Sequence, residues 1–129
     1  MVARGNNHAV RSRFDALVGL RLRGGFIIEQ IETTDEPLID ALGREAAAQT
    51  TIIGHQLSLR LHEDLDAREL SVTLYHEILE AAAVAAAHPP EILLDFNEGN
   101  FVLAAQTMYD RLGPATPETL NRMLQLHGF

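Results

Sequence analysis

The sequence contains no cysteine and no lysine among its 129 residues. The lack of cysteine excludes a disulfide framework, a thiolate metal site and a cysteine nucleophile, and it agrees with a reducing compartment, so we expect a cytoplasmic protein. No stretch approaches the roughly 18 apolar residues of a membrane span, so we expect no membrane partner. The chain also has no phosphate-binding glycine loop and no Gly-x-Ser-x-Gly elbow, patterns typical of nucleotide-binding proteins and of serine hydrolases.

Positive charge is scarce and unevenly distributed. All ten basic residues are arginine, against 18 acidic residues, which gives a net charge of -8. Residues 1–23 carry a net charge of +4, whereas residues 24–129 carry -12. An acidic body repels phosphates, which disfavours nucleic acid as a partner. We predict a basic N-terminal arm or short helix over residues 1–23 and a single folded domain over residues 24–129.

Apolar residues make up 47% of the chain, enough for a packed core, and their spacing predicts a small sheet followed by helices. β-forming residues over 26–33 predict a strand, and a capping side chain before Pro37 predicts a helix over residues 34–49. Residues 51–62 alternate between apolar and polar, which predicts one half-buried strand with His55 on its core side. Capping residues and Pro or Gly stops predict three further helices, which begin near residue 66, near residue 95 or 97, and near residue 116. The fold class is therefore α+β.

The first of these three helices contains the sequence His76-Glu77-Ile78-Leu79-Glu80. Residues four apart lie on one face of a helix, so His76 and Glu80 can direct a ring nitrogen and a carboxylate to one point. Glu77 projects about 100 degrees away from His76, close enough to act on a water held there. A His-Glu-x-x-His helix has this arrangement, with two metal ligands and a glutamate base between them. Here Glu80 stands in the place of the second histidine.

This pattern resembles the zincin-like metallopeptidases, in particular the small ones of the ImmA/IrrE type. In that family a strand precedes the active helix and a glutamate lies on the helix after it, and residues 50–112 show the same order. The resemblance implies a minimal zincin-like domain: a small sheet, the active-site helix and two further helices. It also implies His76 and Glu98 as zinc ligands and Glu77 as the general base. Glu80 departs from the family, so it is either a ligand in a carboxylate-richer site or a sign that the metal site is lost.

Glu98 is also a candidate ligand by its own position. It shares a helical stripe with Phe101 and Ala105, and a carboxylate on an inward stripe needs a partner, such as a metal ion or Arg60. The alternative is a solvated acid in the first turn of a helix, and His76 with Glu80 can equally be an ordinary polar pair. One imidazole and two carboxylates suit manganese or iron as well as zinc, with zinc the first expectation from the resemblance.

We therefore expect a metal-dependent hydrolase, most simply a peptidase that uses a metal-bound water and acts on a peptide or protein. The polar side of the strand at Gln56, Ser58 and Arg60 is expected to pair with an extended substrate. The alternatives are a non-catalytic scaffold for protein interaction or metal sensing, and a structural domain with an acidic helical face. The apolar face of the last helix either covers the core or forms a homodimer interface; it comprises Leu120, Met123, Leu124 and Leu126.

Overall fold

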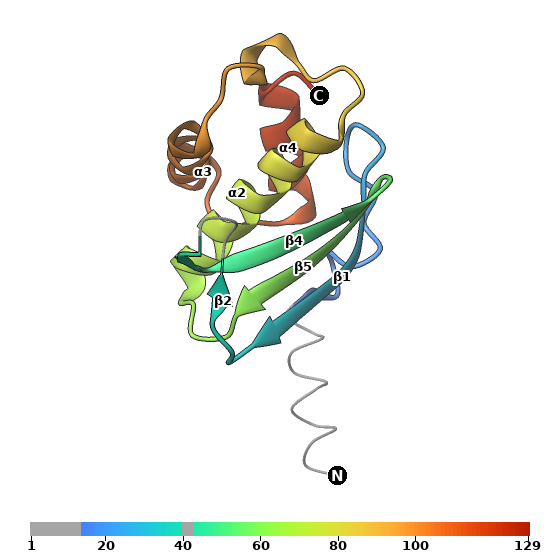
Figure 1. Ribbon diagram of the computed structural model, residues 1–129. Coiled ribbons are helices and arrows are strands. Elements are labelled where there is room, and N and C mark those ends of the chain that lie inside the picture. Colours follow the sequence, from blue (N-terminus) through green and yellow to red (C-terminus); the bar gives the residue numbers. More distant parts are fainter. Residues whose placement is uncertain (1–13, 40–42) are drawn as a thin grey trace.

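The computed structural model describes residues 14–39 and 43–129 and has a main sheet of three strands (Figure 1). The strand order is β1-β5-β4, so β5 is central; it runs parallel to β1 and antiparallel to β4. A second, two-stranded sheet pairs β2 with β3. The strands are β1 (Ile27–Thr34), β2 (Leu38–Ile39), β3 (Glu45–Ala46), β4 (Ala48–Ile53) and β5 (Gln56–His62).

Three α-helices follow the strands and lie on one side of the main sheet (Figure 1). They are α2 (Ala67–Ala85), α3 (Glu98–Leu112) and α4 (Pro117–Leu126), with the short 3-10 helix η1 (Glu91–Leu93) between α2 and α3. Helix α2 occupies the centre of the domain, because it contacts β4, α3 and α4. The predicted α+β class, with strands first and helices after, is confirmed. None of the helices described is long and apolar enough to cross a membrane.

The core lies between the sheet and α2. The predicted alternation along β5 is confirmed, since Leu57, Leu59 and Leu61 are at most 1% exposed and the polar residues between them are not buried. Apolar residues of α2 pack into the same cluster, Ile78 among them. Leu120, Met123 and Leu124 of α4 are fully buried, so the apolar face of this helix covers the core of its own chain.

The core also extends toward the N-terminus. Phe14, Leu17 and Leu22 are at most 5% exposed and belong to the main cluster, although the predicted domain boundary lay at residue 23. Residues 15–22 form turns and an isolated bridge from Arg21 to Ile27, not a helix. The remainder of the predicted N-terminal arm, residues 1–13, lies outside the described residues.

The helix predicted over residues 34–49 is wrong, because this stretch contains β2, β3 and the start of β4. The Thr34 hydroxyl accepts the Glu36 N–H at 3.1 Å, a local turn in place of the expected helix cap. Burial of Leu38 at 2% exposure and pairing of β4 with β5 then stabilise extended backbone. Residues 40–42, in the middle of the predicted helix, lie outside the described part.

The single strand predicted over residues 51–62 is also wrong, because the chain turns at Gly54 and His55. Ile53 pairs with Gln56 across a two-residue connection, and Gly54 has a φ of 61°, as the first central residue of a type II′ turn requires. His55 is therefore exposed in the turn and not a core histidine. The hairpin assigns residues 51–53 of the predicted strand to β4, the edge strand of the main sheet.

Capping residues set where α2 and α3 begin, as predicted. The Asp66 side chain accepts the Glu69 N–H at 2.8 Å, and the Asn97 side chain accepts the Asn100 N–H at 2.9 Å. Both form reciprocal capping boxes, which satisfy backbone donors that a helix leaves free at its start. The Asn97 cap makes Glu98 the first residue of α3 and so places its carboxylate in the first turn of the helix.

We expect Leu59→Ala to destabilise the domain by about 2–5 kcal/mol, because it leaves a cavity between the sheet and α2. Leu103→Ala is the matched control, since Leu103 is 61% exposed on α3, and it should change the free energy of unfolding by less than about 0.5 kcal/mol. Urea unfolding of both variants measures these differences. Equal effects would contradict the core described above.

Candidate metal centre

A cavity of about 880 Å³ lies between α2 and the edge of the sheet. One wall is formed by residues 44–52, which include β4, and the other by one face of α2. Residues at helical spacing on α2 line it, from Thr73 through His76, Glu77 and Glu80 to Val84. Glu98 of α3 completes the lining. The predicted polar face of α2 is thus the wall of a cavity.

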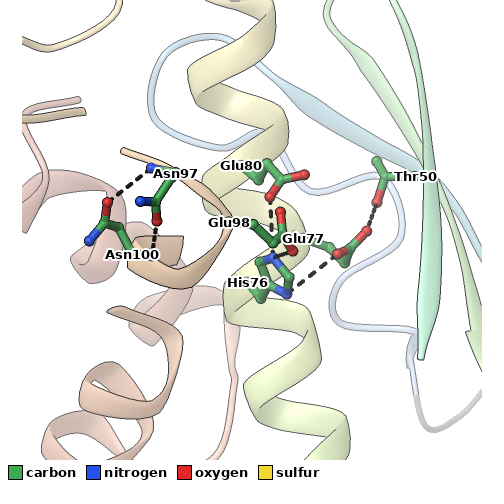
Figure 2. A network of polar contacts seen from close by, with 7 residues as sticks. All are labelled: Thr50, His76, Glu77, Glu80, Asn97, Glu98 and Asn100. Atoms are coloured by element: carbon green, nitrogen blue, oxygen red, sulfur yellow. Dashed lines mark hydrogen bonds and ion pairs between the residues drawn. The ribbon is translucent and has the colours of Figure 1, made fainter. Parts of the chain in front are cut away.

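His76 is the centre of the polar cluster in this cavity (Figure 2). Its Nε2 atom lies 3.2 Å from Oε2 of Glu80, one turn further along α2, and 3.0 Å from Oε1 of Glu98, which reaches across from α3. The ligand atoms of the three side chains all lie within 4.8 Å of one another. The structure therefore brings together the three residues predicted as metal ligands.

Glu77 lies beside this cluster and points toward β4 (Figure 2). Its Oε1 atom accepts a hydrogen bond of 2.8 Å from the Thr50 hydroxyl, and its Oε2 atom lies 3.7 Å from Nδ1 of His76. The Glu77 side chain is 15% exposed, compared with 35% for Glu80 and 58% for Glu98. The candidate base is thus the most enclosed of the three carboxylates, and the candidate ligand on α3 lies at the rim.

Burial and mutual charge shift the pKa values of all four groups. Burial disfavours the imidazolium form of His76, but Glu80, Glu77 and Glu98 outweigh it and raise the pKa of His76 above its ordinary value. Burial raises the pKa of Glu77, against the opposing effect of the Thr50 hydrogen bond. The hydrogen bond with His76 lowers the pKa of Glu80, whereas burial, and then the charge of Glu80, raise that of Glu98. The cluster therefore attracts positive charge.

The donor set fits a divalent cation. One imidazole and two carboxylates are ligands used for zinc, manganese and iron. Ligands about 2.1 Å from a tetrahedral ion lie about 3.4 Å from one another. The distances of 3.0 Å and 3.2 Å from His76 to the two carboxylates would have to widen by only a few tenths of an ångström. His76, Glu80 and Glu98 are thus the residues that would hold such an ion.

The structure does not bring the predicted substrate-binding residues to this cavity. Gln56, Ser58 and Arg60 belong to β5, whose two edges are already paired with β1 and β4. Arg60 forms ion pairs with Glu32 at 3.2 Å and Glu36 at 3.9 Å, so it is not the partner of Glu98. The expected strand pairing with a substrate through β5 is therefore wrong, because a central strand has no free edge.

Sequence reasoning missed Thr50 and did not separate β4 from β5. The helix predicted over residues 34–49 ended just before Thr50, and the predicted strand began just after it. The signal that could have found them is Gly54-His55, because a glycine at the first position of a two-residue loop is typical of a β-hairpin. Counting back from that turn places Ala48, Thr50 and Ile52 on the side of the sheet that faces α2.

Comparison of the chain with protein-family models, with curated proteins and with solved structures finds no match. The resemblance to zincin-like metallopeptidases stays a prediction from residues 50–112. What the cavity can do is inferred below from its own geometry and chemistry.

We expect the metal-free protein to lose stability as the pH rises above 6.5, the ordinary pKa of histidine. The raised pKa of His76 means that the folded state holds this proton more tightly than the unfolded state does. Its contribution to stability is therefore complete below the unfolded value of 6.5 and is lost as the pH rises through the folded pKa. Thermal unfolding in the presence of a chelator measures this decline, which should be smaller in His76→Gln. His88→Gln is the control, since His88 is exposed; equal slopes in all three proteins would contradict the prediction.

Proposed function

We propose that the protein is a metal-dependent hydrolase, most simply a peptidase. His76, Glu80 and Glu98 hold a divalent cation, and Glu77 is the general base. The observation that carries this proposal is the convergence of three ligand atoms from two helices within 4.8 Å, at the wall of an 880 Å³ cavity. A third carboxylate, the enclosed side chain of Glu77 beside the cluster, supplies a group for proton transfer.

The resemblance to zincin-like metallopeptidases favours zinc as the ion, whereas the two carboxylates in the donor set suit manganese or iron as well. A bound cation supplies Lewis acidity, which polarises a carbonyl group and lowers the pKa of water. Glu80 takes the place of the second histidine of the family pattern. Its hydrogen-bond contact with His76 at 3.2 Å supports a ligand role over a lost site, because both side chains already point to one place.

Glu77 moves the proton in this proposal. Its carboxylate takes a proton from the attacking water as the water oxygen bonds to the carbonyl carbon. The carbon–nitrogen bond then breaks, and Glu77 passes the proton to the leaving nitrogen. Burial raises the pKa of Glu77, which favours a group that both accepts and returns a proton near neutral pH.

The substrate is an extended peptide that lies along the free edge of β4. The His62 N–H donates to the Ala47 carbonyl at 2.9 Å. Because antiparallel strands alternate the direction of their backbone groups, the N–H and C=O of Ala48, Thr50 and Ile52 point away from β5. These groups border the cavity and can pair with a peptide as an added strand. The strand proposed to pair with the substrate is thus β4 and not β5, as first expected.

A non-catalytic scaffold is the second candidate, and one observation favours it. His76 already has carboxylate partners at 3.0 Å and 3.2 Å, so the cluster can link α2 to α3 without a bound ion. Such a cluster serves a binding module or a metal sensor as well as an enzyme. Metal content and turnover distinguish these candidates.

Protein purified without added metal should contain about one divalent ion per chain by elemental analysis. His76→Ala and Glu98→Gln each remove one ligand and should lose most of this ion. His88→Ala and Glu118→Gln are matched controls with the same changes at exposed positions, and Glu118 is likewise in the first turn of a helix. A wild-type protein that binds neither zinc, manganese nor iron, even when they are added, would overturn the proposed metal centre.

Glu77→Gln should keep the ion and lose about 10²–10⁴-fold in turnover, because the amide cannot accept the proton from water. A library of quenched fluorescent peptides of mixed sequence measures turnover, with the ion content checked in the same samples. A metal-loaded wild type that cleaves no peptide would favour the scaffold over the peptidase.

A further inference from the structure

Thr50 is the one polar side chain in the inward row of β4. Cross-strand partners share a face of the sheet, and Ala48, Thr50 and Ile52 pair with the buried leucines of β5. The row therefore faces α2, where apolar side chains are expected. Thr50 instead directs a hydroxyl at Glu77, with 2.8 Å between its Oγ1 and Oε1 of Glu77 (Figure 2).

This hydrogen bond joins β4 to α2 through two residues that are 27 positions apart, and it is the shorter of the two contacts given above for the Glu77 carboxylate. The other oxygen of Glu77 lies 3.7 Å from His76, too far for a hydrogen bond. The last side-chain torsion of glutamate is broad, so a carboxylate without a fixed partner rotates. With Thr50 in place, one oxygen is bound to β4 and the other faces Nδ1 of His76.

We propose that Thr50 is the positioning residue for Glu77, so that the edge strand of the sheet sets the orientation of the base. The inference rests on the proposed function of Glu77. It adds that a residue on β4, which is neither a metal ligand nor a proton donor in the reaction, determines the rate of the chemical step. A misplaced catalytic group costs large factors in rate even when binding is intact.

The backbone of Thr50 gives the same residue a second part in the site. Its N–H and C=O point to the open edge of β4, where the peptide is proposed to lie, while its side chain points to Glu77. A peptide paired with this residue is therefore held in register with the base. The two parts can be separated by mutation, because only the hydroxyl is lost in Thr50→Val.

The experiment compares Thr50→Val, Thr50→Ser and Thr51→Val with the wild type. Valine retains the β-branched shape that suits a strand and keeps the backbone, and serine keeps the hydroxyl. Thr51→Val makes the same change on the same strand, at an exposed side chain on the opposite face. All four proteins are loaded with the ion found in the wild type and assayed with the most rapidly cleaved peptide of the library.

Thr50→Val should lower kcat about 10–100-fold, the range for a partner that orients a group at a metal site, and should leave KM and ion content within about twofold. Thr50→Ser should retain kcat within about threefold, and Thr51→Val should lower kcat by far less than Thr50→Val does, because its side chain points away from Glu77. An unchanged kcat in Thr50→Val would overturn the inference, as would a serine variant as slow as the valine variant.

A measurement on the metal-free protein tests the contact without catalysis. The carboxylate ¹³C resonance of Glu77, assigned by its loss in Glu77→Gln, should shift in Thr50→Val and stay in place in Thr50→Ser and Thr51→Val. A resonance unmoved by Thr50→Val would overturn the inference.

These outcomes separate the inference from the function on which it rests. If the wild type is active and Thr50→Val has normal turnover, only the proposed role of Thr50 is overturned. A wild type with no turnover overturns the proposed peptidase, and the role of Thr50 in the chemical step with it.

Discussion

The contact between α2 and α3 is the constraint on which the candidate site depends. Three carboxylates beside one imidazole repel one another and lose water, and this shows in the raised pKa values of Glu77 and Glu98. The packing of α3 against α2 through apolar side chains such as Phe101 and Ala105 offsets this cost. The burial of apolar side chains between the two helices thus holds Oε1 of Glu98 3.0 Å from Nε2 of His76. A cluster so assembled has an excess of negative charge, which a cation can balance.

Much of the helical half of the molecule could be predicted from sequence, because its determinants are local. Asp66 and Asn97 begin helices through side chains that bond three residues away, and His76 and Glu80 meet because they are four residues apart. The helical stripe that Glu98 shares with Phe101 also indicated a carboxylate in need of a partner, although the Glu98 side chain is 58% exposed at the rim of the cavity and not buried. The partner is His76, and the competing expectation of Arg60 failed because Arg60 lies on β5, bound to Glu32.

The sheet was harder to predict, because its determinants are distant in sequence. Residues 45–50 have the composition of a helix, and they become extended because other strands offer partners: β2 pairs with residues 45–46, and β5, which follows in the chain, pairs with residues 48–50. Helical spacing over 34–49 and alternation over 51–62 therefore concealed a hairpin whose turn lies inside the predicted strand. This one error hid Thr50, and it assigned the substrate to the central strand instead of the edge strand. A functional contact between β4 and α2 cannot be read from periodicity along either element alone.

The division of the cluster between two helices has a thermodynamic consequence. His76 and Glu80 can meet on α2 alone, whereas Glu98 arrives only when residues 86–97, with Pro89, Pro90 and η1, bring α3 back against α2. An ion that requires all three side chains therefore binds only when α3 is packed against α2. By linkage, the affinity for the ion includes the free energy of packing α3 against α2. A bound ion stabilises that packing in return. The connection between α2 and α3 contains none of the proposed ligands. Changes in its length or stiffness nevertheless alter the affinity of the cavity for its ion.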